Sequence, residues 1–125
     1  MYEDYIFAQE GKKILDAAFA VHRTLGPGFL EAVYQEALAI ELAKRDIPFS
    51  QQKELTIYYG GKTLNKKYYA DFVCYDAIIL ELKAMEMLIP QHQAQLLNYL
   101  KATQMHLGYL LNFGEAKLNV KRLIL

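Results

Sequence analysis

The chain has 125 residues, of which 54% are apolar, and this is enough for one domain with a buried core. Fourteen basic and fourteen acidic side chains cancel, so the protein as a whole is drawn neither to nucleic acid nor to acidic membranes. Any anion-binding surface must therefore be a local one. A single cysteine, Cys74, excludes an intramolecular disulfide and a CxxC zinc site, and is typical of a reducing compartment.

The N-terminal stretch MYEDYIFAQEGKK is acidic where a signal peptide is basic. The apolar runs of the chain are too short to span a bilayer. We therefore expect one domain over residues 1–125, a cytoplasmic location and no contact with a membrane.

Two amphipathic helices open the predicted fold, because apolar residues recur with a period of about 3.6 over Tyr5–Leu25 and again over about Leu30–Arg45. Gly26-Pro27-Gly28 separates them, since glycine can close a helix in the left-handed conformation and proline cannot extend one. The side chains expected to point inward are Ile6, Ile14, Leu15, Ala18, Phe19 and Val21 in the first helix, and Val33, Leu38 and Leu42 in the second.

Three strands follow the helices. Phe49–Tyr59 contains the alternating piece ELTIYY, and the turn signal Gly60-Gly61 returns the chain into a second strand over Lys62–Tyr75. The third strand, Ala77–Ala84, is almost wholly apolar, which predicts a central strand covered on both faces.

A helix and two short strands complete the chain. Pro90 suits the first turn of a helix that runs to about Thr103. Strands are expected over Leu107–Phe113 and Leu118–Leu125. The whole pattern predicts an α/β fold of order ααβββαββ.

Three charged residues, Asp71, Glu81 and Lys83, lie in the apolar segment YYADFVCYDAIILELKAM, where a charge without a partner is costly. A turn near Asp76 is equally far from the two acids, so an antiparallel hairpin brings their carboxylates roughly opposite each other. Lys83 shares a face with Glu81 because the two are two residues apart on one strand. One interpretation is an ion pair between Lys83 and either acid. The other is a divalent cation, because the ion pair leaves one acid unneutralised and Mg²⁺ prefers oxygen ligands.

This D(x9)ExK arrangement on a hairpin between helices resembles the PD-(D/E)xK nuclease superfamily. GFLEAVY supplies Gly28, Glu31 and Tyr34, which match the GxxExxY signature of a small bacterial branch of that superfamily. QLLNY supplies Gln95 and Tyr99, which are similar to the QxxxY motif of its exonuclease-like branches. The resemblance runs from the first helix to the last strand. It implies a single-domain restriction-endonuclease-like core, with a central mixed sheet of about five strands flanked by helices.

The resemblance also implies an activity, the metal-dependent hydrolysis of phosphodiester bonds with Mg²⁺ or Mn²⁺ as cofactor. The expected metal ligands are Asp71, Glu81 and the backbone carbonyl of Leu82. Glu31 is expected to join them directly or through a bound water. Lys83 is expected to orient the attacking water or to offset the charge that builds up on the phosphate.

Further residues have an expected role and a structural alternative. Gln95 is expected to position Lys83 or the nucleic-acid backbone, with Tyr99 supporting it. Glu31 could instead be an ordinary carboxylate at a helix N-terminus, which the helix dipole favours. Gly28 has a simple alternative as a loop glycine. Tyr34 could fix Glu31, contact a phosphate, or be a packed core tyrosine.

The expected partner is nucleic acid, with DNA favoured over RNA. The best local basic surface comprises Lys62, Lys66 and Lys67, whose alternative is a lysine-protected edge strand. The tyrosines of this region are interpreted first as strand residues and second as platforms for base stacking. Because so small a chain leaves no separate module to read base edges, we expect cutting directed by structure or by ends rather than by sequence.

Two points of organisation stay open. The apolar end LIL could pair across a twofold axis in a homodimer, as in junction resolvases of similar size. The alternatives to an active nuclease are a non-catalytic nucleic-acid-binding or regulatory module on the same fold, and a small interaction partner whose charges are structural.

Overall fold

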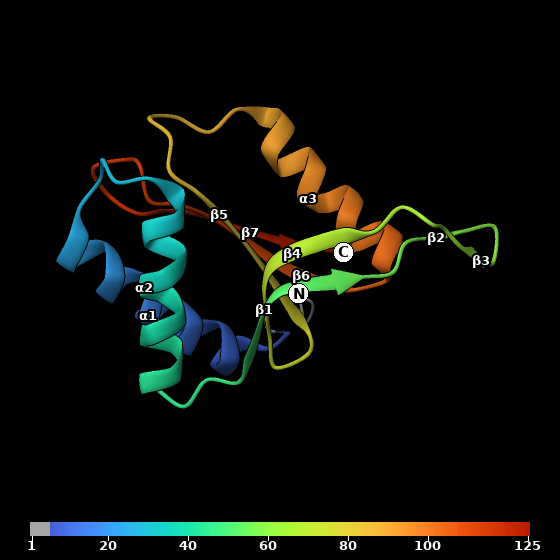
Figure 1. The fold of residues 1–125 in the computed structure, drawn as a ribbon, viewed down its shortest axis with the longest axis horizontal. Helices are drawn as coiled ribbons and strands as arrows, with labels where there is room; N and C mark the ends of the chain where they lie inside the picture. Colours follow the sequence, from blue (N-terminus) through green and yellow to red (C-terminus); the bar gives the residue numbers. More distant parts are fainter. Residues whose placement is uncertain (1–5) are drawn as a thin grey trace.

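The computed structural model describes residues 6–125, as a five-stranded sheet between two layers of helix (Figure 1). Helices α1 and α2 cover one face of the sheet and α3 covers the other. The elements in chain order are α1 (Ala8–Leu25), α2 (Glu31–Lys44), β1 (Phe49–Leu55), β2 (Tyr58–Tyr59), β3 (Lys62–Thr63), β4 (Tyr68–Cys74), β5 (Ile78–Lys83), α3 (Pro90–Thr103), β6 (Leu107–Asn112) and β7 (Asn119–Ile124).

The large sheet has the strand order β1-β4-β5-β6-β7. Strands β5 and β6 pair in parallel because α3 carries the chain back between them, and the other neighbours are antiparallel. The predicted α/β class, the mixed five-stranded sheet and the central position of β5 are confirmed.

Two cores flank the sheet. The core under α1 and α2 includes Ile14, Leu38, Leu42 and the β5 residues Leu80 and Leu82. The smaller core under α3 is built from Leu55, Tyr68, Ala70, Val73, Ile79, Leu96, Leu100 and Leu110. Strand β5 is therefore apolar on both faces, as its sequence predicted.

The helix predictions were right in position and wrong in some details. α1 begins at Ala8, and the start predicted at Tyr5 lies outside the described residues. Phe19 and Val33 were expected to point inward but are 38% and 37% exposed, because each lies outside the buried stripe of its helix. No helix in the described part of the chain combines the length and the apolar character needed to cross a bilayer.

The strands predicted on either side of Gly60-Gly61 each divide in two. Only β1 and β4 belong to the large sheet, whereas β2 and β3 pair as a separate hairpin that projects from the body of the protein (Figure 1). Gly60 and Gly61 have φ of 58° and 78°, as a two-residue turn of this hand requires.

The segment that follows β5 is held by the end of β6. The fully buried Asn112 accepts a hydrogen bond from Met85 N at 3.1 Å and donates one to Met85 O at 2.9 Å, so its amide takes the place of a strand partner. Gly114 lies against the same segment. A Cβ atom there would come within 2.7 Å of the Ala84 carbonyl carbon, and closer still to backbone atoms of Met85.

Gly114→Ala should therefore lower the free energy of unfolding by about 1–3 kcal/mol, since the added methyl meets backbone that cannot move aside. Urea unfolding measures the loss. Ala116→Ser adds one atom to an exposed side chain of the same loop and should stay within about 0.5 kcal/mol of wild type. A Gly114→Ala protein as stable as this control would show that the two segments are not tightly packed.

Candidate functional site

Two carboxylates lie where β4 and β5 separate. The antiparallel ladder ends at the pair Phe72–Leu80, and the next two residues are Asp71 and Glu81. Asp71 N donates a hydrogen bond to Glu81 Oε2 at 2.9 Å, and Leu82 N donates one to Asp71 Oδ2 at 2.8 Å. Each carboxylate thus accepts a hydrogen bond from a backbone N–H of the opposite strand, where a strand carbonyl would accept it in a regular ladder. The cross-strand placement expected from the sequence is present.

The sheet is also irregular around Asp71. Residues two apart on a strand normally share a face, yet Ala70 packs into the α3 core and Phe72 into the α1/α2 core. The register of β1 with β4 puts Gln52 opposite Asp71, and Gln52 has a φ of 50°. A left-handed conformation is uncommon for a residue other than glycine. The regular pleat is therefore interrupted on both strands at the level of the acid.

Asp71 and Glu81, at the point where β4 and β5 separate, are called the fork below. A pair of glutamine amides connects this fork to α2. Gln52 Nε2 donates to Gln35 Oε1 at 3.1 Å and lies 3.5 Å from Asp71 Oδ1. Gln35 Nε2 lies 3.5 Å from Glu31 Oε2. The sequence reasoning missed both glutamines. Gln35 could have been found from its spacing of four residues from Glu31 on one helix, whereas Gln52 gave no signal without the strand register.

Burial dominates the electrostatics of the three acids. It raises the pKa of Glu31, of Asp71 and of Glu81, the last to about 7, with the neighbouring Asp71 charge as the second cause for Glu81 and Glu31. Lys83 lowers each of these pKa values, but by less than burial raises them. Lys83 forms no salt bridge with a carboxylate of the described residues. The cluster is therefore an acid-rich site with a nearby lysine, and the direct ion pair considered from the sequence is not formed.

A buried hydroxyl faces the same acids. Tyr68 is only 6% exposed, and its hydroxyl has no hydrogen-bond partner among the described residues. Burial and then the adjacent Glu81 carboxylate raise the Tyr68 pKa well above its ordinary range. Its ring stacks on Tyr99 of α3, with centroids 3.5 Å apart. A buried hydroxyl without a partner is rare, and this one lies close to the Glu81 carboxylate, which makes the surroundings of the two acids unusually polar for the interior of a sheet.

The oxygen atoms of the fork are suitable ligands for a cation that prefers oxygen, such as Mg²⁺. Two carboxylates each keep an oxygen that is not used by the strand backbone, beside the free Tyr68 hydroxyl. Glu31 approaches this pair but does not complete a metal cage, since within residues 6–125 no three Asp, Glu, His or Cys side chains are grouped closely enough to hold an ion. Asp71, Glu81 and the Leu82 carbonyl remain the predicted ligands.

Tyr34 fixes the position of the first turn of α2. Its ring is fully buried and stacks on Phe113 at 4.8 Å between centroids, and its hydroxyl donates to Gly26 O. Tyr34 is therefore a core residue that ties down the loop before Glu31, and its hydroxyl is hydrogen-bonded to that loop rather than to the Glu31 carboxylate. Gly28 has a φ of 110° in this loop, which supports its interpretation as a loop glycine.

The remaining predicted residues lie around this cluster. Gln95 is exposed on α3, one turn before the half-buried Tyr99 that stacks on Tyr68. The nucleic-acid contacts expected on the second predicted strand are exposed and lie on β3 or in its connection to β4: Lys62, Lys66 and Lys67. The structure thus brings Asp71, Glu81 and Lys83 together, places Glu31 near this group but outside it, and leaves these lysines apart.

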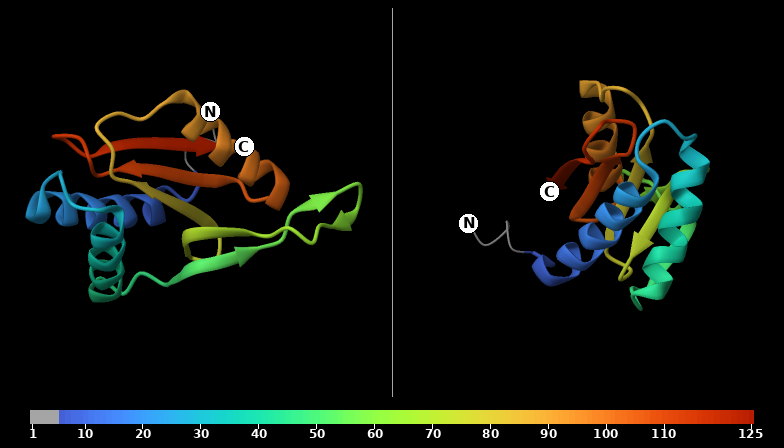
Figure 2. Two further views of the ribbon diagram at one scale, coloured as in Figure 1. Left: turned by 45° about the horizontal axis from the view of Figure 1, so that its top comes forward. Right: turned by 90° about the vertical axis from the view of Figure 1, so that its left-hand side faces the viewer.

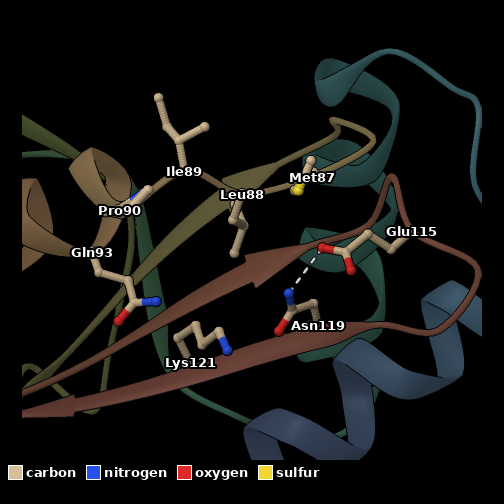
Figure 3. Close-up of a pocket in the computed structure, with 8 residues that line it drawn as sticks. All are labelled: Met87, Leu88, Ile89, Pro90, Gln93, Glu115, Asn119 and Lys121. Atoms are coloured by element: carbon tan, nitrogen blue, oxygen red, sulfur yellow. Dashed lines mark hydrogen bonds between the residues drawn. The ribbon is translucent and has the colours of Figure 1, made fainter.

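A separate pocket of about 290 Å³ lies along the loop that follows β5 (Figure 3). Its lining combines the loop residue Met87 with Gln93 of α3 and Lys121 of β7, and Glu115 accepts a hydrogen bond from Asn119 at 2.9 Å on its floor. No member of the acid cluster lines it, so this pocket and the fork are distinct features.

The raised pKa of Glu81 predicts how the stability of the metal-free protein depends on pH. The folded state keeps the Glu81 proton up to about pH 7, whereas the unfolded state releases it near 4.5. The contribution to stability is therefore fully present below pH 4.5 and is lost as the pH rises to about 7, by roughly 3 kcal/mol at most. Glu81→Gln should flatten this decline in urea unfolding between pH 5 and 8 with chelator present. An equally steep decline in the variant would contradict the assignment.

Asp71→Asn should separate metal binding from folding. At pH 8 the metal-free variant should be at least as stable as wild type, because the amide carries no buried charge and keeps an oxygen for Leu82 N. The rise in melting temperature with added Mn²⁺ should disappear. Asp16→Asn removes an exposed acid on α1 and should retain that rise. A large loss of stability in metal-free Asp71→Asn would instead mark Asp71 as a structural charge.

The amino-acid sequence also matches a known protein family. A sequence model of the PD-(D/E)XK nuclease superfamily matches residues 8–123, from the start of α1 to near the end of β7. No curated protein and no solved structure matches the chain significantly. Members of this superfamily are usually phosphodiesterases that use Mg²⁺ or Mn²⁺. With nearly all of its length matched and its two acids and lysine on adjacent strands, the chain belongs to the PD-(D/E)XK nuclease superfamily.

Proposed function

We propose that this protein is a metal-dependent nuclease of the GxxExxY branch, and that the fork formed by Asp71 and Glu81 is its active site. The observation that carries the proposal is the pair of cross-strand hydrogen bonds, which bring two partly buried carboxylates together beside Lys83. Structural charges would be neutralised directly, whereas these acids have raised pKa values and no salt bridge to Lys83. Such perturbed carboxylates in one cluster are typical of functional sites.

Each residue of the cluster has a proposed task. Asp71 and Glu81, with the Leu82 carbonyl, would hold Mg²⁺ or Mn²⁺, and Glu31 would join from the N-terminus of α2. The bound cation would supply a polarised phosphoryl oxygen and a water of lowered pKa. One oxygen of each carboxylate is tied to strand backbone, so the remaining oxygens are held in place before a ligand arrives. Lys83 would orient the attacking water or offset the charge of the phosphate.

The substrate is proposed to be nucleic acid, DNA before RNA, recognised by its structure or its ends. The matched domain takes up residues 8–123, and the residues proposed to contact the substrate all lie within it. Strand β7 forms an edge of the sheet and is followed by the exposed Leu125, which supports the proposal of a homodimer through this edge.

A non-catalytic nucleic-acid-binding module is the second candidate, because Glu31 does not complete a three-residue metal cluster in the described structure. Purified protein should be assayed with Mg²⁺ or Mn²⁺ against single-stranded, duplex, flapped and branched substrates. Metal-dependent cleavage of any of them supports the nuclease. Binding without cleavage across the panel favours the second candidate.

Lysine substitutions should separate catalysis from binding. Lys83→Ala should lower turnover by about 10²-fold or more with little change in affinity, because its contribution is made in the transition state. Lys66→Ala and Lys67→Ala should do the reverse, weakening binding and flattening its salt dependence. Single-turnover cleavage and anisotropy titrations on one substrate measure both effects. A Lys83→Ala protein that cuts at the wild-type rate would remove the ExK motif from the mechanism.

A further inference from the structure

The β2–β3 hairpin and its flanks form an arm, residues 56–67, that extends away from the sheet in the left view of Figure 2. The arm contains three lysines and neither Asp nor Glu, although the whole chain has no net charge. Every residue of 58–67 is exposed. The arm is therefore a local cationic surface on a neutral protein, which favours an anionic partner.

One face of the arm combines an aromatic ring with a positive charge. Tyr59 and Lys62 are direct cross-strand partners, so their side chains share a face, whereas Tyr58 and Thr63 are the partners on the other. Tyr59 is 76% exposed and belongs to neither core. A tyrosine left this open gains little from folding, and its ring and the neighbouring charge are free for a ligand.

The base of the arm is anchored. Leu64 N donates to Ile57 O at 2.9 Å, and Ile57 packs against the core under α3. The tip closes in the two-glycine turn. An aromatic ring on a formed hairpin has few conformations to lose when a ligand stacks on it.

The arm leads directly into the candidate active site. Lys62 precedes Asp71 by nine residues, which corresponds to at most about 30 Å of extended chain. A single strand of about nine stacked nucleotides covers this distance. One nucleic-acid molecule can therefore touch the arm and reach the fork.

We infer that the arm is a binding site for unpaired nucleotides, in which Tyr59 stacks on a base and Lys62 contacts the adjoining phosphate. This inference rests on the proposed nuclease function and deepens it, because it gives the substrate an unpaired segment within about nine nucleotides of the point of cutting. Inside a duplex the flat faces of the bases are covered by their neighbours, so a stacking platform selects single strands, flaps or ends. If the lysines only protected an edge strand from aggregation, the arm would have no such preference.

The chain contains no tryptophan, so Tyr59→Trp creates a single fluorescent reporter that still stacks. Its emission should be quenched on titration with oligothymidylate or oligouridylate in chelator, and less by a blunt duplex of equal length. Phe19→Trp, on α1 at 38% exposure, is the matched control and should stay unquenched. Tyr59→Ala should weaken single-strand binding about tenfold and duplex binding little, with an unchanged melting temperature.

Tyr59→Trp protein that binds either oligonucleotide by anisotropy without quenching overturns the inference, and so does the absence of single-strand binding. Equal quenching of the control reporter also overturns it. The two proposals fail separately. Quenching without cleavage leaves the arm standing and removes the nuclease, whereas cleavage without quenching removes the arm and leaves the nuclease.

Discussion

The rest of this structure depends on one constraint, which is that two acids on adjacent strands of the sheet must be accommodated close together and largely away from water. Burial opposes the charge of Asp71 and of Glu81, and the charge of Asp71 opposes that of Glu81 further. The backbone N–H groups of Asp71 and Leu82 offset part of that cost, and only because the strands separate at this level. The separation is possible in a central strand, since β5 keeps its full ladder with β6 on the other side.

The surroundings of the fork are fixed by contacts that come from far along the chain. Phe113 follows β6 and stacks on Tyr34, which ties down the loop before Glu31. Asn112, one residue earlier, holds the backbone of Met85 just after the ExK strand. The end of β6 therefore positions both sides of the candidate site. This coupling explains how a small domain can hold an acid cluster in place with a single layer of helix on each face.

Function in so small a chain depends on dividing tasks among few elements. The fork supplies the acids and Lys83, α2 brings Glu31, and the arm presents lysines and Tyr59 beyond the edge of the sheet. The fork is acidic and partly buried, whereas the arm is cationic and exposed. A phosphate backbone would thus be attracted by the arm and would reach the fork only where a bound cation compensates the acids.

The helices, the five strands of the sheet and the meeting of Asp71 with Glu81 could be predicted from the sequence, because periodicity and a turn midway between the acids are local properties. Tertiary structure decided the rest. The projecting arm arises where the pairing of β1 with β4 stops. The left-handed conformation of Gln52 likewise has no signal in the sequence and is seen only in the folded backbone. The raised pKa values depend on how many layers cover a residue. No local pattern encodes that covering, since it is made by segments that are distant in the chain.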